Sequence, residues 1–361
     1  MMRSVALLIG LAVMLVSFGC FDEMPPLPPT VPELSTDTSY VQITPSFGGF
    51  TRPEDVIIGN DQLLYVADTY GGVAGRVVML NRAGQVLSAA SMLRPISVAQ
   101  DGRLDLLVGG TVLTANGDTA GALFRVHVRE ADHDLAVARI DTIWRELARP
   151  ARRFPGITIF GDNTYLVVRD GPDNSSSIDP DALVLQFDDN DRFITPVASL
   201  TTRSGSGITD IYHPTSIASF SGVKDFVITQ SSEPNQVYGA IWLYYQNTPE
   251  FEGWLPRFDP ARTEDRGRDF IRARRFSRPE AVTIDRSRRD IFIADAALDS
   301  IIKFNSRGSF KSESFGKVKS GGVLQDPSGL AYFGFQERIL YVLDRTRGEL
   351  LRFRLTTDAP R

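Results

Sequence analysis

Short apolar segments, separated by turn residues, follow one another from about residue 39 to residue 358. Each segment has four to seven residues, many of them β-branched or aromatic, and is bounded by Gly, Asp, Asn or Pro. This pattern is typical of strands, and no stretch shows the spacing of three and four residues that an amphipathic helix needs. The pattern therefore predicts an all-β fold.

The segments belong to a repeated unit that starts at a proline. In the first copy Pro53 opens one segment, Leu63–Asp68 forms a second that ends in aspartate, and Arg76–Leu80 forms a third. The copies that start at Pro279 and Pro327 keep the same order. Three looser copies start at Pro95, Pro155 and Pro214.

Six units between residues 39 and 358 have about 53 residues each, enough for one four-stranded antiparallel blade. Proline can open a strand but not lie within a central one, so each proline marks the entry of a blade's innermost strand. Outer fourth strands are expected at 86–88, 136–140 and 193–197. The sequence predicts a six-bladed β-propeller, whereas a sandwich would not produce the repeat.

The last unit lacks a fourth strand, because the chain ends soon after Leu355. Residues 39–44 form an unassigned strand-like segment ahead of the first unit. We expect this segment to pair with residues 351–353, so that the N-terminal strand closes the ring and removes a free sheet edge.

The repeats at Pro53, Pro279 and Pro327 resemble NHL repeats, in which a proline and a short strand precede a Tyr-Val-Ala-Asp segment like Tyr65–Asp68. The resemblance implies a six-bladed propeller of the type shared with TolB-like and lactonase-like domains. It implies no activity, because one fold hosts many functions. The aspartates that end the second segments are expected to accept hydrogen bonds that stabilise the blades: Asp68, Asp170, Asp295 and Asp344.

The first 20 residues have the features of an export signal: Arg3, an apolar run from Val5 to Phe18, and Gly19 before Cys20. The run is shorter than the roughly 17–25 residues of a spanning helix. It resembles a bacterial lipoprotein signal, in which the cysteine receives a lipid and becomes the first residue, although Ser17 replaces the usual large aliphatic residue. We expect lipid attachment at Cys20; an ordinary cleaved signal or an uncleaved anchor is the alternative.

Residues 21–38 carry five prolines, which favour an extended spacer. The predicted organisation is therefore a lipoprotein signal peptide over 1–20, a Pro-rich spacer over 21–38 and a propeller over 39–358. Asp22 lies one place beyond the position that marks inner-membrane retention in some bacteria. We expect a protein anchored in the cell envelope by lipid, in the outer membrane rather than the inner one.

Composition limits the chemistry. The formal net charge is −5, which gives no reason to expect nucleic acid as a partner. One cysteine excludes internal disulfides and multi-cysteine metal sites, and only three histidines are present. No zinc site or nucleophile-elbow motif follows, so we expect a binding role rather than catalysis and no cofactor.

The residues that precede the repeat prolines should gather on one face near the axis, since each lies in the turn into an innermost strand. They are Arg52, Arg94, Phe154, His213, Arg278 and Asp326. Arg52, Arg94, His213 and Arg278 would form a funnel for carboxylate or phosphate groups. The alternative is that these arginines form ordinary ion pairs with Glu54, Glu280 and Asp326.

These features predict a scaffold or binding module for a protein, a peptide or a small anionic ligand. The alternative function is a calcium-dependent hydrolase or lyase of the lactonase-like kind, with Glu54 and Glu280 as the candidate metal ligands. A basic stretch over 262–278 contains an alternating segment, 270–276, that is expected to be an exposed outer strand.

Overall fold

The computed structural model describes residues 38–358 except 177, 179, 198, 201, 203–208, 232–236, 260–266, 317–321 and 336. The expected signal peptide with Cys20, the spacer residues 21–37 and part of the basic stretch lie outside the described residues. Among the described residues no helix is long and apolar enough to cross a membrane.

The described strands form six four-stranded antiparallel sheets, as the repeat predicts. The first three blades are β2 (Arg52–Ile58), β3 (Leu64–Thr69), β4 (Ala74–Leu80), β5 (Val86–Leu93); β6 (Ser97–Gln100), β7 (Leu106–Leu113), β8 (Thr119–Val126), β9 (Ile140–Arg145); and β10 (Arg153–Ile159), β11 (Tyr165–Asp170), β12 (Val184–Phe187), β13 (Phe193–Pro196). The next two are β14 (Pro214–Ser219), β15 (Phe226–Gln230), β16 (Ala240–Asn247), β17 (Glu252–Pro256); and β18 (Pro279–Ile284), β19 (Ile291–Asp295), β20 (Ser300–Phe304), β21 (Phe315–Gly316). The sixth contains β22 (Pro327–Phe333), β23 (Ile339–Asp344), β24 (Glu349–Leu355) and β1 (Tyr40–Phe47), and a 3₁₀ turn, η1 (Thr356–Asp358), follows.

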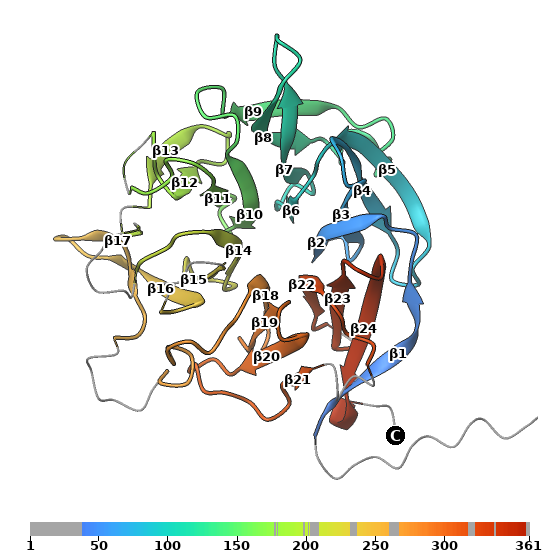
Figure 1. Cartoon of the computed structure of the whole chain (residues 1–361), viewed down its shortest axis with the longest axis vertical. Coiled ribbons are helices and arrows are strands. Elements are labelled where there is room, and N and C mark those ends of the chain that lie inside the picture. The colour runs from blue at the N-terminus through green and yellow to red at the C-terminus, as the bar shows by residue number, and fades with distance from the viewer. Residues whose placement is uncertain are drawn as a thin grey trace, which may run out of the picture. The chain divides into compact units, whose positions relative to one another are not determined.

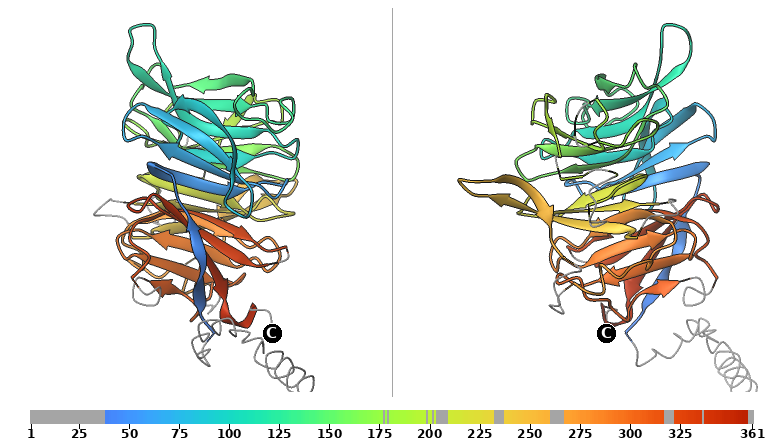
Figure 2. Two further views of the ribbon diagram at one scale, coloured as in Figure 1. Left: turned by 90° about the vertical axis from the view of Figure 1, so that its right-hand side faces the viewer. Right: turned by 60° about the vertical axis from the view of Figure 1, so that its left-hand side comes forward.

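The blades are arranged around a central channel whose wall is formed by the first strand of each repeat (Figure 1). Figure 2 shows the ring from the side, with the sheets stacked face to face. Apolar side chains from adjacent blades fill the space between the sheets; Leu64 and Val66 of blade one, for example, share a core cluster with Tyr341 and Leu343 of blade six. The channel wall is therefore held in place by a core that lies between blades.

The N-terminal strand closes the ring, as expected. In blade six β1 pairs with β24, with Gln42 opposite Phe353 and Ile43 opposite Arg352. Tyr40 is 4% exposed and stacks on Phe315 of blade five, with ring centroids 5.4 Å apart. The closing strand therefore contributes to the core between blades five and six as well as to the sheet.

Two expectations for outer strands are wrong. The outer strand of blade two, β9, begins only at Ile140, because residues before it form turns with Asp132 and His133 at positive φ. Residues 270–276 form turns instead of an outer strand, since the outer strand of blade four is β17. Phe270 is 1% exposed and packs edge-to-face on Phe304, so burial of this aromatic ring overrides the alternating pattern.

The repeated aspartates, with one exception, accept hydrogen bonds from the turn that precedes each innermost strand. Asp68 accepts hydrogen bonds from the backbone N–H groups of Thr51 and Arg52, and Asp295 does the same for Ser277 and Arg278.

Asp344 plays the same part in blade six, where it accepts from the backbone N–H of Gln325. The expectation for Asp170 is wrong: Asp170 pairs with Arg153 one place further along the ladder, and Arg169 takes the equivalent buried position.

Small polar side chains join neighbouring innermost strands around most of the ring. Ser97 Oγ donates to the carbonyl of Phe154, and Ser328 Oγ donates to the carbonyl of Pro53. Thr215 Oγ1 donates to the carbonyl of Pro279. Because each bond crosses from one blade to the next, these residues fix the relative positions of the blades where the channel opens.

Candidate functional site

The turns into the innermost strands gather at one end of the channel, which we call the mouth. Arg52, Arg278 and Asp326 line an open cavity of about 490 Å³ there. Glu54 and Glu280 line a second cavity of about 220 Å³ within the channel itself. Arg345, which follows β23, lines both cavities.

Arg345 is the centre of an ion-pair network that connects blades one, five and six. Its Nε lies 3.0 Å from Glu54 Oε2, its Nη2 3.3 Å from Glu280 Oε2, and its Nη1 3.4 Å from Asp326 Oδ2. Burial alone would lower the pKa of Arg345, but the three carboxylates outweigh that effect and raise the pKa. The guanidinium is therefore held charged.

Two of the predicted funnel arginines complete this network. Arg52 Nε lies 2.9 Å from Glu54 Oε1, and Arg278 lies 3.2 Å from Glu280 and 2.8 Å from Asp326. Arg52 and Arg278 are thus at the mouth as expected, but in the ion pairs of the alternative interpretation.

The predicted calcium ligands, Glu54 and Glu280, lie close together, but their arrangement does not suit calcium. Glu54 and Glu280 both line the inner cavity, yet the cation between them is the Arg345 guanidinium. Calcium needs six to eight oxygen ligands at 2.3–2.6 Å, which requires the carboxylates to leave the guanidinium. Among the described residues no group of three or more His, Cys, Asp or Glu has the arrangement of a metal site.

Arg94 and Arg153 form a different kind of pair at the mouth. Arg94 Nε donates to the carbonyl of Gly72, and Arg153 Nη1 donates to the carbonyls of Pro150 and Arg152. Burial and then the nearby charge of Arg94 lower the pKa of Arg153. Arg94 and Arg153 are thus two like charges that lie close together. Within the described part of the chain neither has a carboxylate partner that would balance its charge.

The register of blade three explains why Arg153 belongs to this set. Arg153 pairs with Asp170 just as Arg52 pairs with Thr69, so Arg153 is the structural equivalent of Arg52. Pro155 lies one place later than the other repeat prolines. Phe154, expected at the mouth, is instead fully buried in the core between blades.

His213, the fourth predicted funnel residue, is half exposed and lies beside a carboxylate. Its Nδ1 is 3.0 Å from Asp170 Oδ1. Asp170 lines the inner cavity, so this pair connects blades three and four at the mouth. Like Arg52 and Arg278, His213 is engaged with an acidic neighbour.

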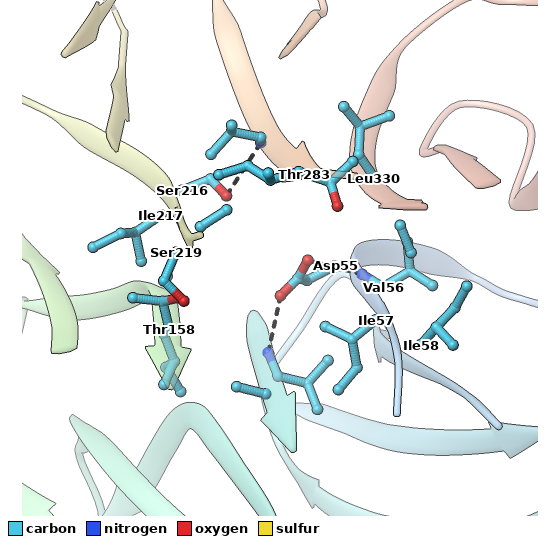
Figure 3. Close-up of a pocket in the computed structure, with 18 of the residues that line it drawn as sticks. Asp55, Val56, Ile57, Ile58, Thr158, Ser216, Ile217, Ser219, Thr283 and Leu330 are labelled. Atoms are coloured by element: carbon cyan, nitrogen blue, oxygen red, sulfur yellow. Dashed lines mark hydrogen bonds between the residues drawn. The ribbon is translucent and has the colours of Figure 1, made fainter. Parts of the chain in front are cut away.

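Asp55 lies in the channel wall below Glu54, where Figure 3 shows its carboxylate beside the neighbouring strand. Its two oxygens accept from the backbone N–H groups of Val56 and Val98, at 2.8 and 2.9 Å. Burial raises the pKa of Asp55 to about 7, and these hydrogen bonds oppose the rise only in part. Asp55 therefore joins blades one and two and titrates near neutral pH.

Sequence reasoning missed Arg345, Arg153 and Asp55. Arg345 occupies the place after a strand-ending aspartate, which is Thr69 in blade one and Ala296 in blade five, so comparison of the repeats gives no hint of charge there. Arg153 could be found by aligning the repeat on its second strand instead of on the proline. Asp55 is adjacent to a predicted ligand, and its environment depends on the neighbouring blade.

Comparisons with known proteins support the fold. No family model and no curated protein sequence matches the chain. A solved structure described as glucose dehydrogenase superposes with a TM-score of 0.60 at 11% identity, over 88% of this chain and 99% of that one. An auxiliary nutrient binding protein from Bacteroides ovatus gives 0.57 at 9% identity, over 88% and 77%. A gluconolactonase from Xanthomonas campestris gives 0.52 at 13% identity, over 88% and 97%.

The shared feature is the propeller, and at such low identities the similarity carries no activity to this chain. The set spans two enzyme classes and a binding protein. The NHL resemblance accordingly stays a likeness of sequence pattern.

Proposed function

We propose that this protein binds an anionic ligand at the mouth of its channel, through Arg94 and Arg153. The ligand class is a carboxylate- or phosphate-bearing molecule, either a small acid or the acidic segment of a peptide or protein. Arginine suits both because its planar guanidinium binds such groups through two parallel hydrogen bonds.

This proposal rests on a difference between the arginines at the mouth: some form ion pairs with carboxylates and others do not. Arg52, Arg278 and Arg345 all lie within 3.4 Å of carboxylates, and their charge is balanced. Arg94 and Arg153 repel each other instead, and burial together with this repulsion lowers the pKa of Arg153. An anion bound between them removes that repulsion, so binding there gains more than at the paired arginines.

The ion-pair network of Arg345 has a supporting role in this proposal. Because it connects blades one, five and six, it fixes the part of the rim that these three blades form. Preorganised charges lose less free energy on binding than mobile ones. The nutrient binding protein from Bacteroides ovatus is an example of a similar propeller described as a binding protein.

We place this binding function in the bacterial cell envelope, with the chain anchored by lipid on Cys20. The support is the resemblance of residues 1–20 to a lipoprotein signal and the proline-rich residues that follow. Lipid attachment would keep the propeller at a membrane and make the ligand a component of the envelope.

The experiment is a calorimetric titration at low ionic strength with two probes, citrate and a hexaglutamate peptide. The double variant Arg94→Gln/Arg153→Gln is expected to bind the preferred probe at least about tenfold more weakly, since two charge-assisted contacts are lost. The control, Arg288→Gln/Arg307→Gln, removes the same net charge at exposed sites and should bind normally. Unchanged binding by the first variant would reject the proposal.

The two probes separate the two sources of ligand: citrate alone points to a small acid, the peptide alone to an acidic segment. A natural partner can then be sought by capture with the full-length protein in mild detergent, with the Arg94→Gln/Arg153→Gln variant as the comparison. The lactonase-like alternative rests on the fold, and the arrangement of Glu54 and Glu280 around Arg345 does not favour it.

A further inference from the structure

The end of the channel opposite the mouth holds a further polar cavity, which shares Asp55 and Ser216 with the inner cavity. It has a volume of about 160 Å³ and is lined by the later residues of the innermost strands, among them Ile58, Thr158, Ser219 and Thr283. Figure 3 shows these side chains around the channel. A single oxyanion group or a few water molecules fill such a volume, because a water occupies roughly 30 Å³.

Arg286 lies at this end and spans its opening. It follows β18 of blade five, and its Nη1 donates to Asn60 Oδ1 of blade one at 3.0 Å. Blade six separates blades five and one in the ring, so the hydrogen bond can form only if the Arg286 side chain crosses the opening. The guanidinium therefore faces the cavity that it lines.

Asn60 is held in the orientation that receives this bond. Its Nδ2 donates to the carbonyl of Asp101, and its backbone N–H donates to Gln100 Oε1 at 2.6 Å. With both donors engaged by blade two, Asn60 presents Oδ1 to Arg286. The arginine is thus positioned by a fixed neutral acceptor.

No carboxylate among the described residues forms an ion pair with Arg286. The adjacent Asp285 is buried and accepts from the backbone N–H and hydroxyl of Ser287. Asp61, also near this end, accepts from Tyr65 and Gln100. Desolvation by the surrounding protein lowers the pKa of Arg286, with no opposing effect from a negative charge.

Hydroxyl groups of the innermost strands line the same cavity as Arg286. Thr283, three residues before Arg286, lines the cavity, and its hydroxyl has no hydrogen-bond partner among the described residues. Thr158 Oγ1 donates to Ser219 Oγ at 2.8 Å, and Ser219 Oγ donates in turn to the carbonyl of Ile159. Arg286 and Thr283 are consequently two donors that remain for a ligand, beside the hydroxyl of Ser216, which only accepts, from the backbone N–H of Val282.

We infer that this end of the channel is a second anion site, in which Arg286 and the Thr283 hydroxyl bind one oxyanion group such as sulfate, phosphate or a carboxylate. The site is independent of the proposed mouth site, since it uses other residues at the other end of the channel. Its ligand is a small one, because the cavity has a volume of only about 160 Å³.

The test is a sulfate titration by calorimetry at constant ionic strength, with chloride as the compensating anion. Sulfate is the probe because it keeps its charge at any working pH. The titration is run at pH 6, since the pKa of Asp55 at the inner end of the cavity is about 7 and its carboxyl is then mostly neutral. Variants are Arg286→Gln, Thr283→Val and, as a matched control two residues away, Arg288→Gln.

We expect one sulfate per chain in the parent, a loss of about tenfold or more in affinity for Arg286→Gln, and a loss of severalfold for Thr283→Val. Arg288→Gln and the mouth variant Arg94→Gln/Arg153→Gln should retain this binding. The inference is overturned if the parent binds no sulfate or if Arg286→Gln binds it as tightly as the parent. Loss of sulfate binding in the mouth variant alone would place the anion at the mouth and also overturn it.

Discussion

Arg278 Nη2 lies 2.8 Å from Asp326 Oδ1, and this ion pair joins blades five and six at the mouth. At most other joints a hydroxyl or carboxyl group of an innermost strand bonds to the next blade, as Asp55 and Ser97 do. Blade five has Ala281 at the equivalent position of β18, and its methyl group offers no such bond to blade six. The ion pair between Arg278 and Asp326 therefore takes the place of such a hydrogen bond at this joint. Arg345 strengthens the joint, because it also pairs with Asp326.

Arg345→Gln should destabilise the fold. The change leaves Glu54, Glu280 and Asp326 close together with one balancing charge fewer. Since these side chains are partly exposed, we expect a loss of about 2 kcal/mol, less than for a fully buried pair. Urea unfolding measures it, and Arg345→Lys, which keeps the cation, should lose less.

Calcium should stabilise the Arg345→Gln variant. Without the guanidinium the three carboxylates are oxygen ligands for a divalent cation. Millimolar Ca²⁺ is expected to raise the melting temperature of Arg345→Gln and to leave the parent and Arg345→Lys unchanged. A parent stabilised by calcium as strongly as the variant would instead support the calcium-dependent alternative with Glu54 and Glu280.

Asp55→Asn should alter how stability depends on pH. Burial raises the pKa of Asp55 from 3.8 to about 7, so the folded state binds this proton more tightly than the unfolded state. The stabilisation from Asp55 is therefore complete below about pH 4 and is lost as pH rises to about 7.

The free energy of unfolding of the parent minus that of Asp55→Asn should fall across this range and stay level above it. Urea unfolding at intervals between pH 4 and 8 measures the difference, in which other groups cancel. Asp118→Asn, at an exposed loop position, should show no such trend. A constant difference for Asp55→Asn would contradict the assignment.

Glu146→Gln should strongly destabilise blade three. Glu146 Oε1 lies 2.9 Å from Arg169 Nη1, and its other oxygen is 3.7 Å from Arg152, both arginines being 1% exposed. Removing the charge takes one carboxylate away from two buried guanidinium groups, at a cost of about 3–5 kcal/mol in unfolding free energy. Glu130→Gln, at a side chain 62% exposed, should change stability by less than about 1 kcal/mol in the same measurement.

Tyr40→Ala tests the closing strand. Tyr40 packs on Phe292 and Phe315 and is almost fully buried, so its removal should cost about 3–5 kcal/mol. The neighbouring Val41 is 44% exposed, and Val41→Ala should cost no more than about 0.5 kcal/mol. Equal effects of the two substitutions in urea unfolding would show that closure does not depend on this packing.

Cys20→Ala tests the anchor. If the cysteine receives a lipid, the variant should lose incorporation of labelled fatty acid and move from the membrane to the soluble envelope fraction. Ser17→Ala, which keeps Cys20, should behave as the parent does. A Cys20→Ala protein that still incorporates as much labelled lipid would rule out Cys20 as the attachment site.

The regular part of the fold could be predicted because the repeat carries it. The prolines at 53, 279 and 327 open strands, and the missing fourth strand of the last unit leads directly to residues 39–44 as its replacement. The prediction was wrong where burial overrides a local pattern: Phe270 lies between blades four and five in sequence and is buried in the core that these two blades form.

The site was less predictable, because the sequence shows which residues approach the mouth but not which ones pair. Arg52 and Arg94 occupy equivalent places before their prolines, yet Arg52 has Glu54 two residues later and Arg94 has no such neighbour. Arg153 was missed because a one-residue offset at Pro155 shifts the whole blade against the repeat. Register and ion pairing depend on contacts between blades, which a single repeat does not contain.

The seam between β1 and β24 also affects the order of folding. Tyr40 and its strand are synthesised early, but their partner strand, Glu349–Leu355, is synthesised almost last. During that interval β1 is an unpaired edge strand, and the ring can close only when nearly the whole chain is available. A chain shortened before residue 349 consequently loses both the last strand and the strand with which the first one pairs. The ring of blades cannot then close.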